Sequence, residues 1–160
     1  MRITLGAIGR LKKGPEQELV ARYIDRTGKA GRAVGITGIN TVELPESRLD
    51  TAALRQRDEM EGLLARVGSA EPLIVFDERG KNPTSRQFAK LLGRALDRGA
   101  SHTACLIGGP DGLDESLRNK ADHVIGFGAL TMPHQIARIL VAEQLYRAVT
   151  ILTNHPYHRD

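Results

Sequence analysis

Residues that can stack on a base, move a proton or hold a phosphate gather near the end of the chain. Residues 154–160 read NHPYHRD, so Tyr157, His158 and an arginine lie within one short segment. Tyrosine can stack on a nucleobase, and histidine can transfer a proton near neutral pH. A polar tail of this length is also typical of a frayed C-terminus. Composition alone therefore leaves an RNA-facing tail and a disordered tail both open.

A long apolar segment precedes this tail and carries a few charged residues. Residues 133–149 have helical spacing and are apolar on more than one face, with Arg138, Glu143, Gln144 and Arg147 as the polar exceptions. A helix of this kind is buried or is shared with a partner chain. Arg147 lies one turn after Glu143, so its spacing fits a simple ion pair and a substrate-binding role equally well.

Glycine or acidic residues follow three of the predicted strands. These segments are Phe76-Asp77, Gly108-Gly109-Pro110 and residues 126–132. Glycine lets a backbone approach a ligand closely, and ligands of open α/β sheets bind beyond the carboxyl ends of the strands. For any one of these loops taken alone, a tight turn is the better explanation. Three of them in one small sheet predict a shared pocket.

Several well-known motifs are missing from the sequence. It has no GxxxxGK[ST] phosphate loop, no zinc-type Cys/His spacing and no GxSxG motif. Gly126-Phe127-Gly128 begins like GxGxxG, but Thr131 stands where the third glycine belongs and too little chain follows. These absences argue against kinases, dehydrogenases, zinc enzymes and ordinary esterases, and no metal site is predicted. The single cysteine, Cys105, is predicted to be a buried structural thiol.

Strand and helix patterns alternate along the chain, which predicts an α/β fold with a mostly parallel sheet flanked by helices. The predicted strands cover residues 2–8, 40–44, 72–77, 102–109 and 123–128. The predicted helices cover residues 15–27, 47–67, 85–98, 113–121 and 133–149. Asp50 or Thr51 is expected to cap the second helix, and Ser85 the third. Residues 28–38 hold four glycines and are predicted to form an exposed, mobile loop.

Length and composition indicate one domain, residues 1–160, with an ordinary hydrophobic content of 41%. The net charge is +4, and the first 32 residues hold eight basic residues against three acidic ones. Such an excess attracts RNA phosphates or simply solvates a surface, and charge alone favours neither. No apolar run has membrane-spanning length and no signal peptide is evident, so a cytoplasmic protein is expected.

Four segments together resemble the RlmH family, the ribosomal RNA large subunit methyltransferases H of the SPOUT class. They are FDERG, LIGGPDGL, ALTMPHQIARILVAEQLYRA and NHPYHRD. The resemblance extends over nearly the whole chain and is densest from Leu73 onward. It implies a SPOUT-type fold with a C-terminal trefoil knot, and a homodimer with its site at the subunit interface.

The same resemblance implies a reaction and its residues. The cofactor would be S-adenosylmethionine, and the reaction would methylate N3 of a pseudouridine in large-subunit ribosomal RNA within the ribosome. Neither a membrane nor DNA is expected as a partner. The family's substrate-side positions match Arg147, Tyr157 and His158. Its cofactor positions match residues already found at the strand ends: Phe76, Gly108, Phe127, Gly128, Ala129, Leu130, Thr131 and Met132.

The sequence departs from the family pattern at one point of the expected pocket. Relatives commonly have a Ser-Leu-Ser-like run where this chain has Gly126-Phe127-Gly128, so two hydroxyl groups are missing. Cofactor binding should survive if the family's contacts there come from the backbone, and should weaken if a hydroxyl contributes. A non-catalytic ribosome-binding factor of the same fold, or a methyltransferase acting on another RNA such as transfer RNA, are the alternatives.

Overall fold

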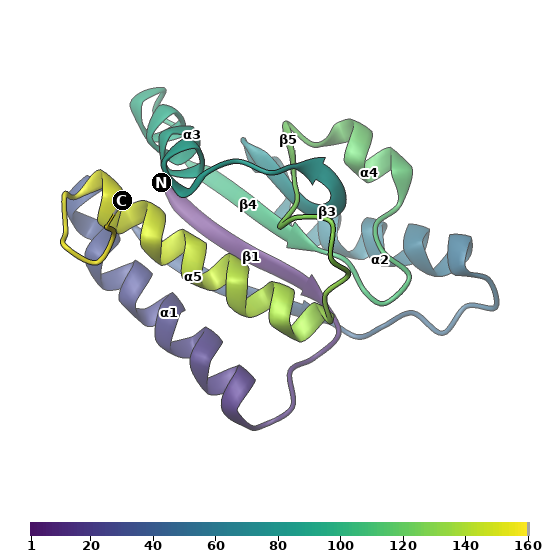
Figure 1. Ribbon diagram of the computed structural model, residues 1–160. Coiled ribbons are helices and arrows are strands. Elements are labelled where there is room, and N and C mark those ends of the chain that lie inside the picture. The colour runs from purple at the N-terminus through teal and green to yellow at the C-terminus, as the bar shows by residue number, and fades with distance from the viewer. Residues whose placement is uncertain (160) are drawn as a thin grey trace.

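A five-stranded sheet, parallel throughout, forms the centre of the computed structural model, which describes residues 1–159 (Figure 1). The strands are β1 (Arg2–Ile8), β2 (Gly38–Leu44), β3 (Leu73–Lys81), β4 (His102–Ile107) and β5 (His123–Ile125). Their order across the sheet is β2-β1-β4-β3-β5. The carboxyl ends of β3, β4 and β5 therefore lie next to one another, as the sequence predicts.

Helices cover both faces of this sheet. Helices α1 (Pro15–Gly31), α3 (Ser85–Asp97) and α5 (His134–Leu152) pack on one face, and α2 (Ala52–Val67) and α4 (Glu115–Lys120) pack on the other (Figure 1). Side chains alternate between faces along each strand. Accordingly Ile74 and Cys105 belong to the core beneath α5, whereas their neighbours Val75 and Leu106 belong to the core beneath α2. The prediction of an α/β fold is confirmed.

Cys105 lies in the middle of the core and is fully buried. Burial raises the pKa of its thiol to about 12, because a buried thiolate would lose its hydration. A thiol that stays protonated is a weak nucleophile. This agrees with a structural role for Cys105.

The prediction of an exposed, mobile loop at residues 28–38 is wrong. Helix α1 continues through Gly31, a 3₁₀ turn covers Arg32–Val34, and β2 begins at Gly38. Ile36 is only 1% exposed, and a Cβ atom at Gly31 would lie 2.9 Å from the Cβ of Ile36. The glycine gives space for this close approach, so its presence here reflects packing and not flexibility.

Smaller differences concern the ends of the elements. Helix α2 begins at Ala52 and not near residue 47, and Thr51 caps it by accepting a hydrogen bond from Leu54 N. Thr84 caps α3 in place of Ser85, because its hydroxyl and the side chain of Gln87 form a reciprocal capping box. Strands β4 and β5 end two and three residues earlier than expected, where their glycine-rich loops leave the sheet.

Segments 76–82 and 125–128 cross closely. Ile125 pairs with both Phe76 and Lys81, and Gly126 N donates to the Lys81 carbonyl at 2.8 Å. A Cβ atom at Gly80 would lie 2.5 Å from the carbonyl carbon of Ile125, so no side chain fits there. The loop after β3 thus contacts the chain after β5 along its backbone. Such contacts are expected at a crossing of the trefoil knot, and the knot itself stays a prediction.

No helix within residues 1–159 is both long enough and apolar enough to span a membrane.

Candidate active site

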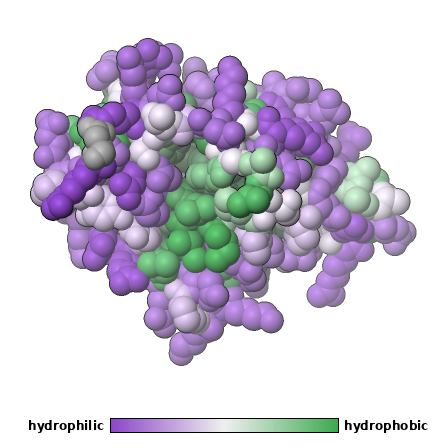
Figure 2. All heavy atoms as spheres, in the orientation of Figure 1, coloured by the Kyte–Doolittle hydropathy of each residue, from purple (hydrophilic) through white to green (hydrophobic). Residues whose placement is uncertain are grey.

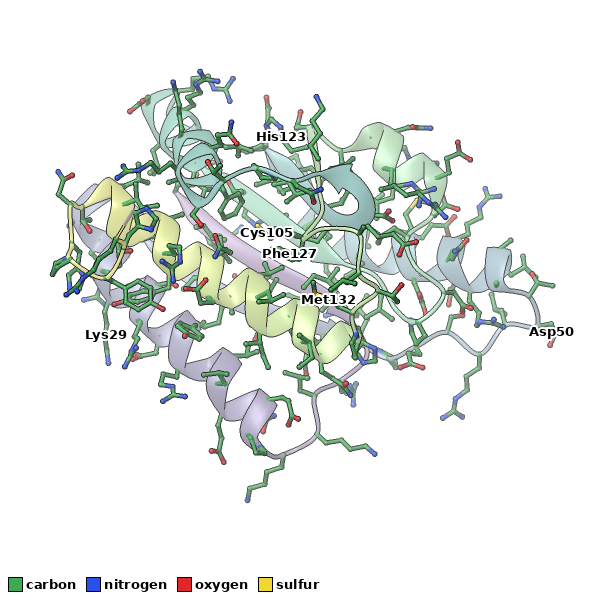
Figure 3. The ribbon with its side chains drawn as sticks, in the orientation of Figure 1. Lys29, Asp50, Cys105, His123, Phe127 and Met132 are labelled. Atoms are coloured by element: carbon green, nitrogen blue, oxygen red, sulfur yellow. The ribbon has the colours of Figure 1, made fainter. Side chains whose placement is uncertain are left out.

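A cavity of about 360 Å³ lies beyond the carboxyl ends of β3, β4 and β5. Its volume falls in the range of about 300–1,000 Å³ that is usual for small-molecule sites. Phe127 and Met132, both labelled in Figure 3, belong to the chain segment after β5 that borders this cavity. Ala129 is the one predicted cofactor residue that does not line the cavity. The other seven do: Phe76, Gly108, Phe127, Gly128, Leu130, Thr131 and Met132.

Aromatic rings form one wall of this cavity. The rings of Phe76 and Phe127 stack with centroids 5.4 Å apart and an interplanar angle of 11°. Phe88 of α3 supports Phe76 edge-on from behind, at 6.2 Å. Leu130, by contrast, is 78% exposed at the mouth of the cavity. The cavity therefore offers a flat apolar wall and an apolar edge to a ligand.

Asp77, the acid at the end of the predicted third strand, ties two loops of the site together. Its carboxylate accepts hydrogen bonds from Arg79 N at 2.9 Å and from Arg118 Nη1 at 3.3 Å. Arg118 also donates to the carbonyl of Leu113. Because the Asp77 side chain is only 7% exposed, it stabilises the loop geometry more than it contacts a ligand.

Helix α2 contacts the loop after β4 through two of its side chains, Arg55 and Gln56. Arg55 forms a two-pronged ion pair with Asp111, with Nε–Oδ2 at 2.7 Å and Nη2–Oδ1 at 3.2 Å. This hydrogen-bonded pair lowers the pKa of the Asp111 carboxyl. Gln56 donates to the Asp111 carbonyl and lines the cavity. Sequence reasoning missed Arg55 and Gln56, since residues on an ordinary polar helix give no signal of a contact 56 residues away.

Asn82 explains how the site accommodates Gly126-Phe127-Gly128. Its Oδ1 accepts a hydrogen bond from Gly128 N at 2.8 Å. A Cβ atom at Gly126 would lie 2.9 Å from the same oxygen, so Asn82 fills the space that a side chain at 126 would need. Gly128 has a φ of 103°, which few residues other than glycine adopt. A side-chain amide thus orients this glycine-containing loop.

The three predicted substrate-side residues meet at the far end of α5. Arg147 donates through Nε and Nη2 to Glu143 Oε1, at 2.9 and 2.6 Å. Its guanidinium carbon lies 4.9 Å from the centre of the Tyr157 ring, and its Nη1 lies 3.3 Å from His158 Nδ1. Arg147 therefore forms the ion pair with Glu143 and also lies beside the tail. The ion pair does not exclude a substrate-binding role for Arg147. We call Glu143, Arg147, Tyr157 and His158 the tail cluster.

The tail is packed against the protein over its described residues, which end at 159. Tyr157 donates its hydroxyl to Glu143 Oε1 at 3.0 Å and packs edge-on against Tyr146, with ring centroids 4.7 Å apart. Burial raises the pKa of the Tyr157 hydroxyl, and hydrogen bonds with Tyr23 and Glu143 raise it further. The Tyr157 hydroxyl therefore keeps its proton at neutral pH. The frayed-tail interpretation does not describe Tyr157, while Asp160 lies outside the described residues.

Within one chain the tail cluster lies apart from the cavity. Ala137 of α5 lines the cavity, whereas Arg147 lies ten residues further along the same helix. At 1.5 Å of rise per residue, this separation is about 15 Å along the helix axis. None of the three predicted substrate-side residues lines the cavity.

Comparison with known proteins identifies the family. A family model described as predicted SPOUT methyltransferase matches residues 1–158. The chain belongs to the SPOUT methyltransferase family. It is 54% identical over 159 residues to a protein from Rhizobium etli named ribosomal RNA large subunit methyltransferase H, covering 99% of both chains. It is 52% identical over 160 residues to the protein of the same name from Brucella anthropi, covering 100% of both.

Solved structures of low sequence identity share the fold of this SPOUT chain. A probable methyltransferase from Bordetella pertussis superimposes with a TM-score of 0.53 at 15% identity, covering 92% of this chain and 95% of that one. A probable methylase from Haemophilus influenzae gives a TM-score of 0.52 at 14% identity, covering 99% of this chain and 70% of that one. These two likenesses concern the fold alone.

Proposed function

We propose that this protein transfers the methyl group of S-adenosylmethionine to N3 of a pseudouridine in large-subunit ribosomal RNA. The observation that carries the proposal is full-length identity above 50% to relatives named as methyltransferases of that RNA. The cavity at the strand ends and the tail cluster supply the two kinds of site that this reaction needs.

The cavity suits a nucleoside cofactor with a sulfonium group. The flat wall made by Phe76 and Phe127 can contact an adenine ring. Gly108 and Gly128 carry no side chain, so backbone carbonyl groups of their loops can approach the base and the ribose. Bound there, S-adenosylmethionine supplies an electrophilic methyl carbon. Thr131, Met132 and the exposed Leu130 would enclose it and exclude water.

The tail cluster suits the base that is methylated. Removal of the N3 proton would make that nitrogen the better nucleophile toward the methyl carbon that bound S-adenosylmethionine would supply. Tyr157 is a poor proton acceptor because its hydroxyl stays protonated, and it donates to Glu143 instead. His158 is the better candidate for the base, and Arg147 would stabilise negative charge on the pyrimidine.

The geometry at His158 adds a condition to this mechanism. The guanidinium of Arg147 can only donate, so the contact from its Nη1 uses the lone pair of His158 Nδ1 in the neutral imidazole. Nε2 then carries the proton. For His158 to take up a proton at Nδ1, Arg147 must first turn away. A negatively charged pyrimidine oxygen would draw Arg147 in that direction, so binding of the target base and release of His158 would be coupled.

A homodimer would bring the two sites together. About 15 Å of helix separates Arg147 of the tail cluster from Ala137, which lines the cavity of the same chain. Apolar surface gathers over α5 and the loop before it (Figure 2), where Leu130 is 78% and Ile136 is 42% exposed. Covering such a patch with a second copy of the chain is favourable. We propose that the tail cluster of one copy then faces the cavity of the other.

The decisive test is methyl transfer to large ribosomal subunits from cells that lack this protein. Incorporation of a labelled methyl group, mapped by mass spectrometry to N3 of one pseudouridine, is the expected result. Deletion of residues 156–160 should abolish transfer and leave S-adenosylmethionine affinity nearly unchanged in calorimetry, while Leu130→Glu should weaken that affinity. Binding to the subunits without methyl incorporation would contradict the proposal, as would full turnover by the truncated chain. A strict monomer in light scattering would contradict the shared site.

A further inference from the structure

A second polar cavity, of about 390 Å³, opens at the opposite end of the sheet from the cofactor cavity. It lies on the α2 face, at the amino ends of β1, β2 and β4. Its polar lining consists of Arg2, Thr4, Asn40, His102 and Arg66, the last from the final turn of α2. No carboxylate among the described residues lines it. Neither the cofactor site nor the tail cluster uses any of these residues.

Hydrogen bonds fix the direction in which the groups of this cavity donate. Thr4 Oγ1 donates its only proton to Asn40 Oδ1 at 3.0 Å. The same oxygen lies 2.9 Å from His102 Nε2, so it must accept there, and Nε2 carries the proton of His102. Because Asn40 accepts through Oδ1, its NH₂ group remains a donor.

The two arginines add positive charge that no acid balances. Within residues 1–159 neither Arg2 nor Arg66 forms an ion pair or a side-chain hydrogen bond. The buried Thr4, which is 3% exposed, anchors the floor of the cavity between Asn40 and His102. The cavity therefore combines two guanidinium groups and an amide NH₂ group around a fixed polar floor. This is a set of donors suited to the oxygens of a phosphate.

We propose that this cavity binds a phosphate group of the RNA backbone. The proposal rests on the proposed function for its choice of RNA. Helix α5 runs antiparallel to β1, so the tail cluster and this cavity lie toward the same end of the sheet, on opposite faces (Figure 1). An RNA that presents its base to the tail cluster can place a neighbouring segment of backbone at this end. The cavity is thus an additional anchor for the substrate, separate from the reacting groups.

Arg66 also has a purely structural use, since a cation in the last turn of a helix complements the helix dipole. The test must therefore separate phosphate binding from helix stability. The double variant Arg2→Gln/Arg66→Gln in the full chain removes both guanidinium groups of the cavity. Arg48→Gln/Arg94→Gln is the matched control, because it removes the same charge from exposed arginines that line none of the cavities described above.

The first measurement uses the protein without RNA. Burial and the charge of Arg2 lower the pKa of His102, and a bound anion would raise it again. Addition of inorganic phosphate should shift the ring proton signals of His102, assigned by His102→Gln, more than chloride does at equal ionic strength. The shift should persist in the control and be lost in Arg2→Gln/Arg66→Gln. An equal response to chloride would overturn the proposal.

The second measurement uses large ribosomal subunits. Arg2→Gln/Arg66→Gln should bind them about tenfold more weakly, and its plot of log affinity against log salt should be less steep by about one to two units. The control should lose less than about threefold in affinity, and all proteins should unfold at the same temperature. Equal losses in both double variants would overturn the RNA anchor. If the wild-type chain does not bind the subunits, the proposed function fails, and the phosphate titration alone then decides whether the cavity is an anion site.

Discussion

Two arginines on α5, nine residues apart, have opposite surroundings. Arg138 is 1% exposed, and its Nη2 donates to the carbonyls of Ile8 and Gly9 at 3.0 and 2.9 Å. Its Nη1 forms an ion pair with Glu43 of β2. Arg147 keeps a quarter of its side chain exposed and bonds to Glu143 of its own helix and to the tail.

This difference separates an arginine that is buried in the fold from one that is partly exposed to solvent. The partners of Arg138 are two main-chain carbonyls at the carboxyl end of β1 and the carboxylate of Glu43, so it fixes the start of α5 beside the cofactor cavity. The partners of Arg147 are side chains that can rearrange. A guanidinium that bonds backbone carbonyls in the core is structural, whereas one that shares a partly exposed carboxylate with a tyrosine hydroxyl can exchange partners.

Removal of Arg138 should have the largest effect on stability. Arg138→Leu leaves the Ile8 and Gly9 carbonyls without this donor and removes the ion pair with Glu43, which keeps only its hydrogen bond from Leu11 N. Breaking a pair with one buried partner typically costs about 3–5 kcal/mol. Urea unfolding monitored by circular dichroism measures the loss. Arg147→Leu should cost at most about 1 kcal/mol, because its ion pair is partly solvated. Similar losses of stability in both variants would show that Arg138 and Arg147 contribute equally to the fold.

Arg147→Lys should have the largest effect on catalysis. Lysine keeps the charge but cannot reproduce the two-pronged geometry, so methyl transfer should fall about 100-fold. Calorimetry should find unchanged affinity for S-adenosylmethionine, because Arg147 does not line the cofactor cavity. The proposal places the cofactor at the start of α5 and the substrate at its far end. Weakened cofactor binding with normal turnover in Arg147→Lys would contradict it.

Two substitutions at Tyr157 separate the role of its ring from that of its hydroxyl. Tyr157→Phe should lower methyl transfer only about threefold, whereas Tyr157→Ala should lower it about 30-fold by removing the ring beneath Arg147. The raised pKa means that the hydroxyl stays protonated from neutral pH past its ordinary value near 10. The pH profile of Tyr157→Phe should therefore parallel that of the wild type between about pH 6 and 9. If the pH profile of Tyr157→Phe lacked a rise or fall in rate that the wild type shows, Tyr157 would instead be the base.

Gly126→Ser tests the packing of the loop on the cofactor side. The new side chain would collide with Asn82 Oδ1, so affinity for S-adenosylmethionine should fall about tenfold. Addition of Asn82→Ala should restore part of that loss, although Asn82→Ala alone weakens binding by removing the hydrogen bond to Gly128. Such a double-mutant cycle isolates the coupling of the two residues. Additive losses would show that residues 126 and 82 are not coupled through the contact at Asn82 Oδ1.

Substitution of Glu59 in α2 should have a smaller effect, a change in the melting temperature that depends on pH. Its side chain is buried, Oε2 has no hydrogen-bond partner among the described residues, and burial raises its pKa. Because the pKa is higher in the folded state, protonated Glu59 favours folding relative to the ionised form. This effect is complete below the unfolded pKa of about 4.3 and is lost as pH rises through the folded pKa. Glu59→Gln cannot ionise, so it should melt about 2–4 °C higher than the wild type at pH 8. The two proteins should differ little at pH 4, and an equal difference at both pH values would exclude ionisation as the cause.

The sequence by itself determined the alternation of strands and helices and the position of the loops at the strand ends. Both follow from local periodicity and from glycine, which act over a few residues. Thr51 and Gly68 at the ends of α2 belong to the same class, because capping needs only neighbours. Resemblance to a family, not periodicity, is the ground on which Arg147, Tyr157 and His158 are proposed as substrate-side residues.

Only the tertiary structure decided which polar residues serve the site and which serve the fold. Asn82, Arg55 and Arg118 contact the loops of the site across 41 to 56 positions of sequence, which no local pattern encodes. Residues 28–31 continue a helix despite two glycines, because close packing on β2 and Ile36 outweighs their weak helix propensity. The separation of the tail cluster from the cavity likewise follows from the length and direction of α5 across the sheet. Burial and long-range partners are properties of the packed chain, so they become visible only once it is folded.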